Sequence, residues 1–227
     1  MRALVFFALE SEARPFRRWA AGQPDCQIAV TGMGRIQAVR SAEKILRPGV
    51  SDLVLTCGFA GALNPVLRCG QIVLDADPAF PLIDKMSKTG GIPGRFLLVP
   101  EVIVTAADKT ALWNSSGADA VDMESAAIRD ICRQRGLPGA TVRVISDTAR
   151  QDLPLDFSRL MDPAGRIRYP QLTLALVQSP RRIAGLLQFG RQLRHCSRNL
   201  ADFLAAVLIG DGSRRANLPL MPGALGP

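Results

Sequence analysis

The stretches Val-Asp-Met-Glu-Ser-Ala-Ala at 121–127 and Thr-Val-Arg-Val-Ile-Ser-Asp at 141–147 decide the fold predicted for this chain. The first places two acidic residues directly before an apolar segment with helical spacing, which is typical of a helix start. The second is an apolar run that ends in a carboxylate, which is typical of a buried strand. Glu124 and Asp147 are therefore a candidate pair of catalytic carboxylates.

Strands and helices alternate along the chain on both sides of these two stretches. The expected strands are 2–8, 28–31, 53–56, 70–74, 102–105 and 140–145. The expected helices are 9–18, 35–46, 108–113, 123–135 and 180–208. This alternation predicts an α/β fold with a central mixed β-sheet flanked by helices, in which ligands bind at the carboxyl ends of the strands.

Composition limits the domain count and the kinds of site. A chain of 227 residues with 48% hydrophobic content is long enough for one large core. We expect one catalytic domain at 1–209 and a disordered tail at 210–227, where Gly, Pro, Ser and Arg dominate. Five scattered cysteines without a C-x-x-C pair suggest neither disulfides nor a zinc site. The single His195 argues against a Ser-His-Asp triad or a histidine-built metal site, so we expect no metal.

Charge and targeting signals bear on location and partners. The sequence contains no apolar run long enough for a membrane span and no signal peptide, so we expect a cytoplasmic protein. Its net charge is +8, and arginines crowd the expected helix 180–208. These arginines could contact phosphate, anionic lipid at the inner membrane face, or nucleic acid. Because only 5% of the residues are aromatic, we expect no nucleic-acid partner.

Glycines follow two of the expected strands, at Gly32 and Gly34 and at Gly58 and Gly61. Glycine at such places lets backbone N–H groups approach a ligand closely. The alternative is a tight strand-to-helix turn with no ligand. A Gly-x-Gly pair without a third glycine is a poor dinucleotide fingerprint, so no redox cofactor is expected.

Each candidate charged residue also has an ordinary structural explanation. Asp122 and Glu124 fit a helix cap and a first-turn acid, and Asp147 fits a cap for the next turn. Arg143 needs an anionic partner if it is buried, and otherwise it is an exposed edge residue. Glu12, taken alone, is a surface helix residue. The residues by themselves leave these alternatives open.

Several motifs occur in the order and spacing of one known superfamily. They are Ala-Leu-Glu-Ser-Glu at 8–12, Thr-Gly-Met-Gly-Arg-Ile-Gln-Ala at 31–38, Cys-Gly-Phe-Ala-Gly at the start of 57–73, and the segments 121–127 and 142–149. Over residues 1–150 the chain resembles the purine nucleoside phosphorylase and methylthioadenosine/S-adenosylhomocysteine nucleosidase superfamily. Its segments 105–112 and 179–187 are similar to the hopanoid-associated phosphorylases, which release adenine from adenosylhopane.

The resemblance implies a role for each matching residue. It places Glu124 on the ribose 2′ and 3′ hydroxyls and Met123 beneath the sugar. Asp147 would protonate N7 of the departing purine, with Ser146 beside it. Glu12 and Arg143 would contact the nucleophile. Backbone N–H groups around it would come from Gly34 and Arg35, which are the expected phosphate-binding residues. Further N–H groups would come from Gly58, Phe59 and Ala60.

Two departures from the superfamily pattern affect the expected reaction. Phe59 stands where the hydrolytic branch usually has a serine that helps to hold the attacking water. The expected nucleophile is then phosphate, bound by Arg35 and Arg143. Orthophosphate is the expected co-substrate, and no cofactor is expected. The segment 75–101 is shorter than in the nucleosidases, so the aromatic that stacks on the purine cannot be carried over; the candidates are Phe80 and Phe96.

The sequence thus predicts phosphorolysis of a purine nucleoside by a pentosyltransferase. Because a short lid would leave the 5′ side open, a lipid-linked nucleoside such as adenosylhopane is the expected substrate, in hopanoid side-chain synthesis. One alternative is a hydrolytic nucleosidase. Another is a basic protein that binds membrane or nucleic acid through 180–208 and has an idle pocket. The resemblance also implies a homo-oligomer.

Overall fold

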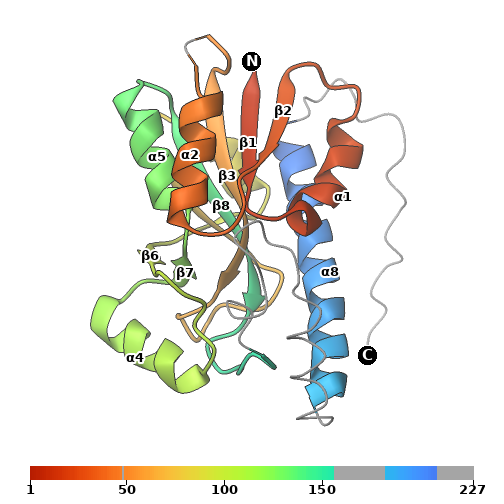
Figure 1. Cartoon of the computed structure of the whole chain (residues 1–227), viewed down its shortest axis with the longest axis vertical. Helices are drawn as coiled ribbons and strands as arrows, with labels where there is room; N and C mark the ends of the chain where they lie inside the picture. Colours follow the sequence, from red (N-terminus) through yellow and green to blue (C-terminus); the bar gives the residue numbers. More distant parts are fainter. Residues whose placement is uncertain (48, 156–181, 209–227) are drawn as a thin grey trace.

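The computed structural model describes residues 1–47, 49–155 and 182–208 (Figure 1). The expected disordered tail at 210–227 and most of the segment that leads to the last helix lie outside these residues. In the part of the chain that is described, no helix is long and apolar enough to cross a membrane.

A six-stranded sheet forms the centre of the fold. Its strands, in spatial order, are β2 (Cys26–Val30), β1 (Ala3–Phe7), β3 (Leu53–Gly61), β8 (Gly139–Asp147), β4 (Ile72–Ala76) and β5 (Ile92–Pro93). Neighbouring strands are parallel except β4 and β8, which are antiparallel. The sheet is therefore mixed, and the carboxyl ends of β1, β3 and β8 lie together at its lower edge in Figure 1.

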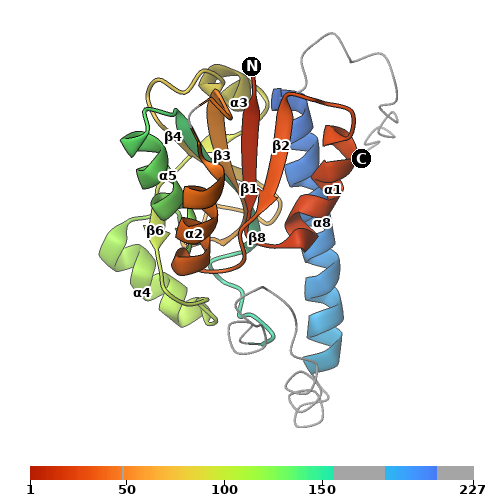
Figure 2. The same cartoon turned by 45° about the horizontal axis from the view of Figure 1, so that its top comes forward.

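Helices cover both faces of this sheet. On one face lie α2 (Arg35–Ile45) and α5 (Ser125–Gln134), and on the other lie α1 (Glu10–Ala20) and α8 (Arg182–Leu208) (Figure 2). The remaining elements are α3 (Ile83–Lys88), α4 (Ala106–Ser116) and the short parallel pair β6 (Phe96–Leu98) and β7 (Ala120–Asp122). The expected α/β fold is confirmed.

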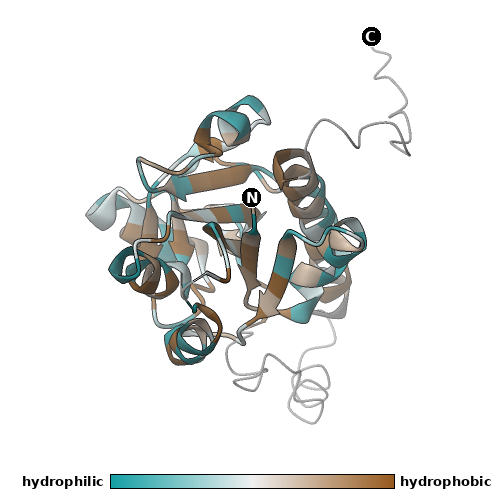
Figure 3. Cartoon of the chain, turned by 90° about the horizontal axis from the view of Figure 1, so that it is seen from above, coloured by the Kyte–Doolittle hydropathy of each residue, from teal (hydrophilic) through white to brown (hydrophobic). Residues whose placement is uncertain are grey.

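The alternation of side chains along β1 explains the two helix layers. Leu4 and Phe6 lie in a cluster with residues of α2 and α5, whereas Val5 and Phe7 lie in the larger cluster with residues of α1 and α8. All these side chains are buried because successive residues of a strand point to opposite faces of the sheet. Seen from above, the apolar colour gathers on the strands and on the inward sides of the helices (Figure 3).

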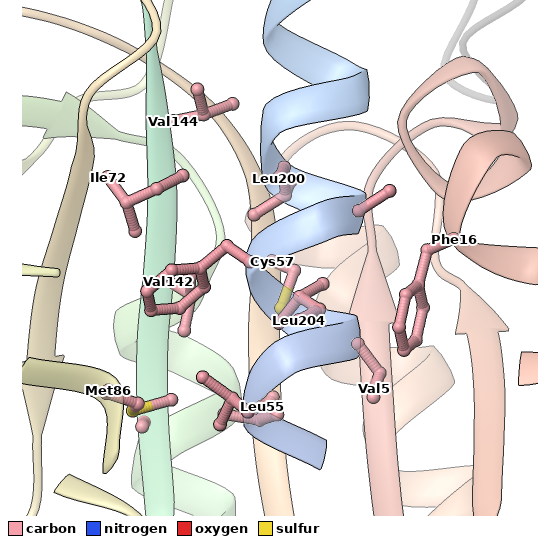
Figure 4. Close-up of a cluster of buried hydrophobic side chains, with 14 of the residues drawn as sticks. Val5, Phe16, Leu55, Cys57, Ile72, Met86, Val142, Val144, Leu200 and Leu204 are labelled. Atoms are coloured by element: carbon pink, nitrogen blue, oxygen red, sulfur yellow. The ribbon is translucent and has the colours of Figure 1, made fainter. Parts of the chain in front are cut away.

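The apolar face of α8 packs against the sheet. Leu200 and Leu204 lie among Leu55, Cys57 and Val142, and all five side chains are at most 1% exposed (Figure 4). Complete burial of one such side chain stabilises the fold by roughly 1.5–3 kcal/mol. The apolar side of the expected basic helix is therefore used for the core, and its charged side is the side left at the surface.

The sequence prediction missed or misplaced several elements. Residues 102–105 form no strand, and α3, β5, β6 and β7 were not predicted. These missed elements have six residues or fewer, too short for a hydrophobic period to show. The strand predicted at 53–56 continues as β3 through Gly61, so the glycines at 58 and 61 lie within the strand's last residues rather than in a loop after it.

Candidate active site

The end of β8 lies beside the end of β3 in the centre of the sheet. Gly58 is paired with Arg143, and Gly61 with Asp147, with an irregularity in the pairing between Ala60 and Gly61. Arg143 and Asp147 are 2% and 4% exposed. Both residues are thus held on a central strand, with Asp147 at its carboxyl end, where open α/β sheets bind their ligands, and Arg143 inside the strand.

Glu12 lies in the first turn of α1 and faces inward, 4% exposed. Its Oε2 accepts a hydrogen bond of 2.9 Å from the Leu9 N–H, and its Oε1 accepts one of 2.8 Å from the Phe59 N–H. Burial raises the pKa of Glu12, and the Arg143 charge and these hydrogen bonds oppose that rise. Glu12 is therefore a buried site residue and not a surface helix residue.

Arg143 is the cation around which the acidic residues gather. Its Nε donates a hydrogen bond of 2.7 Å to Asp122 Oδ1, a second guanidinium nitrogen also contacts Asp122, and that same nitrogen lies 3.6 Å from Glu124 Oε2. Burial works to lower the pKa of Arg143, but the charges of Asp122, Glu124 and Glu12 outweigh it and raise that pKa. The alternative of an exposed edge arginine is therefore wrong.

Gly58 permits the close approach of Glu12 and Arg143. A Cβ atom at this position would lie 2.5 Å from Arg143 Nη1 and 2.7 Å from Glu12 Oε1. At distances this short the neighbouring atoms must shift, so a side chain here would displace the ends of Arg143 and Glu12. The glycine thus holds space for the charged cluster in β3.

Asp122 combines two functions at the start of α5. Its Oδ2 accepts hydrogen bonds from the N–H groups of Glu124 and Ser125 and from the Ser125 hydroxyl, while its Oδ1 receives Arg143. Burial works to raise the pKa of Asp122, but Arg143 and Ser125 outweigh it and lower that pKa. The Asp122 carboxylate accepts N–H groups at the start of α5, although Glu124 and not Asp122 holds the N-cap position, and the same carboxylate also anchors Arg143.

Glu124 occupies the N-cap position of α5 and is 8% exposed. Its Oε1 accepts a hydrogen bond of 2.8 Å from the Gly34 N–H, which links the glycine-containing loop before α2 to the cluster. Burial raises the pKa of Glu124 to about 7, partly offset by Arg143. Glu124 thus changes charge near neutral pH.

Asp147 lies in a second buried group at the end of β8. Its Oδ1 accepts a hydrogen bond of 2.6 Å from the Ser146 hydroxyl, and its Oδ2 one of 2.5 Å from Lys109 Nζ. The Ser146 hydroxyl also lies 3.2 Å from the Ala60 carbonyl oxygen, and one hydroxyl proton serves one acceptor at a time. Rotation of this hydroxyl toward Ala60 would free Oδ1.

Lys109 is the site residue that sequence reasoning missed. Its side chain is fully buried, and its ammonium donates to Asp147, to the Thr148 carbonyl at 3.1 Å and to the Gln151 carbonyl at 2.7 Å. These contacts use all three donors of the ammonium. A sequence signal existed, because Lys109 shares one face of α4 with Leu112 and Trp113, at spacings of three and four residues.

The remaining predicted site residues lie at the same edge but differ in exposure. Met123 is half-buried between Asp122 and Glu124, and the Phe59 side chain packs against the larger core cluster, so only its backbone N–H reaches Glu12. Arg35 is exposed at the first position of α2 and has no ion pair with a described residue.

The two aromatic candidates for stacking on a base lie in different parts of the fold. Phe80 is 2% exposed within the larger core cluster, and its N–H bonds to Asp77, which also contacts Gly139 at the beginning of β8. That is the edge of the sheet opposite the candidate site, so the Phe80 suggestion is wrong. Phe96 is half-buried in a third apolar cluster beside β7.

Known proteins resemble this chain in sequence and in fold. Residues 89–177 match the sequence profile of the family described as the Phosphorylase superfamily. A 5′-methylthioadenosine/S-adenosylhomocysteine nucleosidase from Shewanella halifaxensis is 24% identical over 184 residues, which are 65% of this chain and 80% of the relative.

Solved structures share the fold over most of the chain. The futalosine hydrolase of Helicobacter pylori superposes with a TM-score of 0.66 at 15% identity, covering 91% of this chain and 97% of that one. The 5′-methylthioadenosine/S-adenosyl homocysteine nucleosidase of Campylobacter jejuni gives a TM-score of 0.65 at 16% identity, with coverage of 91% and 98%. Part of the chain thus matches the Phosphorylase superfamily in sequence, and the described fold is the one found in these solved hydrolase and nucleosidase structures.

Proposed function

We propose that this protein cleaves the N-ribosidic bond of a purine nucleoside and releases the base. The observation that carries the proposal is the buried cluster in which Glu12, Asp122 and Glu124 surround Arg143 at the sheet edge that also holds Asp147. The nucleosidases named above support it, because their names describe enzymes that act on nucleosides.

The charge balance of this cluster suits the transition state of the reaction. Breaking an N-glycosidic bond builds positive charge on the ribose, and an anionic environment stabilises that charge. Glu124 is the proposed acceptor for the ribose hydroxyls, because the residue is not fully buried. The hydrogen bond from the Gly34 N–H to its Oε1 holds the carboxylate in place. We assign Met123, next to it, to the underside of the sugar.

Asp147 is the proposed partner of the departing base. The base gains negative charge as the bond breaks, and a proton or hydrogen bond at its N7 lowers the barrier. For this step the Ser146 hydroxyl would turn to Ala60 and release Asp147 Oδ1, which would take up a proton from solvent and pass it to N7, while Lys109 keeps Oδ2 in place. Lys109 then serves as a positioning residue for Asp147.

Water is the acceptor that the cluster favours. The single positive charge of Arg143 already faces three carboxylates, so a phosphate anion would enter a site with no free cation among the described buried residues. Glu12, with its raised pKa, is the proposed base that takes a proton from the water. This assignment makes the protein a hydrolase.

Phosphate remains the second candidate acceptor, and two observations favour it. Phe59 offers only a backbone N–H to the site, so it supplies no hydroxyl to hold a water. Arg35 is exposed and unpaired among the described residues at the start of α2, where a helix N-terminus attracts anions. Phosphorolysis would make Gly34 and Arg35 the phosphate-binding residues, with orthophosphate as co-substrate and no further cofactor.

The proposed substrate is an adenine nucleoside with a bulky apolar 5′ group, adenosylhopane being the case suggested by the sequence. Support comes from the hopanoid-type motif that contains Lys109 and from the short segment 75–101, which contributes the end of β4 together with α3, β5 and β6. We also propose a peripheral membrane contact through the charged side of 180–208 and assembly into homo-oligomers, which light scattering after gel filtration would test.

The decisive experiment supplies adenosine, methylthioadenosine and a 5′-alkyl adenosine with and without orthophosphate and follows adenine release. Release that is independent of phosphate supports the hydrolase, and release that requires phosphate and forms a ribose 1-phosphate supports the phosphorylase. Absence of release from all three nucleosides, with a folded protein, would contradict the proposed function. Asp147→Asn serves as the inactive reference.

A further inference from the structure

An open groove of about 570 Å³ runs between α1 and α8, away from the candidate active site. The two helices lie side by side in Figures 1 and 2. One face of each helix lines the groove, with the residues Ser11, Arg14, Pro15, Arg18 and Trp19 from α1 and Arg194, Ser197, Arg198, Ala201 and Asp202 from α8.

Four arginines line this groove with little opposing charge. Arg14 and Arg18 are four residues apart on α1, and Arg194 and Arg198 are four residues apart on α8. Like charges at this spacing destabilise a helix. Two such pairs face one another here, which adds to the repulsion.

The counter-charge within the described residues is small. Asp202 is the one acidic residue of the groove lining, and it interacts electrostatically with Arg198. Glu10, also on α1, is already paired with Arg17 at 2.9 Å. No described carboxylate lies within salt-bridge distance of any of the four groove arginines.

We propose that the groove is a binding site for a phosphate-bearing anion, and that a diphosphate group fits its charge best. The four arginines and one aspartate of the lining leave a formal excess of three positive charges. Guanidinium groups recognise phosphate oxygens through paired hydrogen bonds. Trp19, 38% exposed, and Pro15 provide an apolar wall for the group that carries the phosphate.

The site is separate from the proposed catalytic residues. Glu12, on the same helix, points inward to Phe59 and Leu9, whereas Arg14 and Arg18 are exposed. None of the groove residues forms a hydrogen bond or ion pair with Arg143, Glu124 or Asp147. Binding in the groove and nucleoside cleavage can therefore fail independently.

Trp19 gives a direct reporter for the test. The chain has two tryptophans, so Trp113→Phe leaves Trp19 as the only one. In this background, pyrophosphate is titrated while tryptophan emission is followed, and binding is checked by calorimetry. The test variant is Arg14→Glu with Arg198→Glu, and Arg14→Gln with Arg198→Gln is a milder version if the first fails to fold. Single Arg14→Glu and Arg40→Glu variants form a charge-matched pair, because Arg40 is exposed on α2, outside the groove.

We expect saturable pyrophosphate binding that weakens roughly tenfold or more for each reversed groove arginine. The Arg40→Glu variant should bind within about twofold of the parent. Equal weakening by Arg40→Glu and Arg14→Glu would show a non-specific charge effect and overturn the proposal.

The source of the phosphate is resolved by vesicles in a second arm. The site is assigned to a lipid headgroup if the protein floats with phosphatidylglycerol vesicles but not with phosphatidylcholine vesicles, and if the groove variants lose this flotation. Pyrophosphate binding without flotation assigns it to a soluble phosphate compound. The proposal would be overturned if the protein neither binds pyrophosphate nor floats with vesicles. It would also be overturned if the protein does not bind pyrophosphate and the groove variants float as well as the parent.

Discussion

Two buried cations lie at the carboxyl edge of the sheet, and their charges are balanced differently. Arg143 faces Asp122, Glu124 and Glu12, so it is outnumbered by carboxylates. Lys109 faces one carboxylate, Asp147, and two backbone carbonyls. The arginine cluster therefore has acidic groups to spare for a substrate, whereas the lysine group is neutral and has every donor in use.

This difference separates binding from positioning. A buried carboxylate in excess of its counter-charge has a raised pKa, as Glu124 has, and our proposal gives this carboxylate the ribose hydroxyls as donors. A buried ammonium with all donors satisfied fixes its neighbours in place. The arginine cluster thus suits contact with the sugar, and the lysine group suits the fixed placement of one acid.

The largest effect is expected for Arg143→Met. The substitution leaves three carboxylates buried without their cation, which should lower the free energy of unfolding by about 3–5 kcal/mol. Urea denaturation followed by circular dichroism measures it, with Arg40→Met on α2 as the exposed control. If Arg143→Met loses no more than about 1 kcal/mol beyond the loss of Arg40→Met, the stability of the cluster does not depend on this arginine.

Lys109→Met is expected to destabilise the protein less, by about 3 kcal/mol, because it leaves one unpaired carboxylate instead of three. The same denaturation assay applies. Adding Asp147→Asn should recover part of the loss, since it removes the buried charge. If the double variant is less stable than Lys109→Met alone, Asp147 is not the group that Lys109 stabilises.

Glu124→Gln tests the proposed sugar contact. Replacing a charged acceptor of ribose hydroxyls should lower kcat/KM for adenine release roughly 100-fold. Because the pKa of Glu124 is about 7, the parent's activity should rise with pH through that value, and the variant should lack this rise. Activity within about threefold of the parent would remove Glu124 from the proposed mechanism.

Gly58→Ala should disturb only the arginine cluster. The added methyl lies 2.5 Å from Arg143 Nη1 and must displace it, which should cost about 1–3 kcal/mol of stability. Gly22→Ala is the control, because its Cβ would meet nothing within 4 Å although its φ is also positive. Equal stability of the Gly58→Ala variant and the parent would show that the cluster has room to spare.

The smallest effect expected is on the pH dependence of the free energy of unfolding. Glu124 has a folded pKa of about 7 against an ordinary value of 4.5, so between these values the folded protein keeps a proton that the unfolded chain has lost. Its contribution to stability therefore decreases as pH rises from about 4.5 to 7. Thermal melts of the parent and Glu124→Gln across that range should diverge toward neutral pH, and parallel curves would contradict the assignment.

Much of the site was readable from sequence because strands and helix starts are local features. The apolar run before Asp147 and the acidic pair before α5 placed Glu124 and Asp147 at ends of elements, and Arg143 inside a strand, without any structure. Lys109 was not readable in this way. Its burial depends on where α4 lies against the segment after β8, and those two pieces are distant in sequence.

The role of Asp122 also shows that sequence predicts local contacts but not contacts between separate elements. Sequence indicated a capping acid, and the Asp122 carboxylate accepts the Ser125 N–H at the start of α5. Its second bond, to Arg143, joins the end of β7, just before α5, to the central strand β8 across 21 residues. Capping follows from local backbone geometry, whereas an ion pair of this kind needs the strand and the helix to be packed together first.

By itself the sequence determined the α/β class, the order of the main elements and most of the acids at the sheet edge, because hydrophobic period and capping act over a few residues. Tertiary structure alone decided how charge is balanced there, with Arg143 outnumbered by carboxylates and Lys109 matched to Asp147. It also decided that the arginines of α1 and α8 share one groove. Charge balance is a property of groups brought together from distant segments, and only the fold sets those distances.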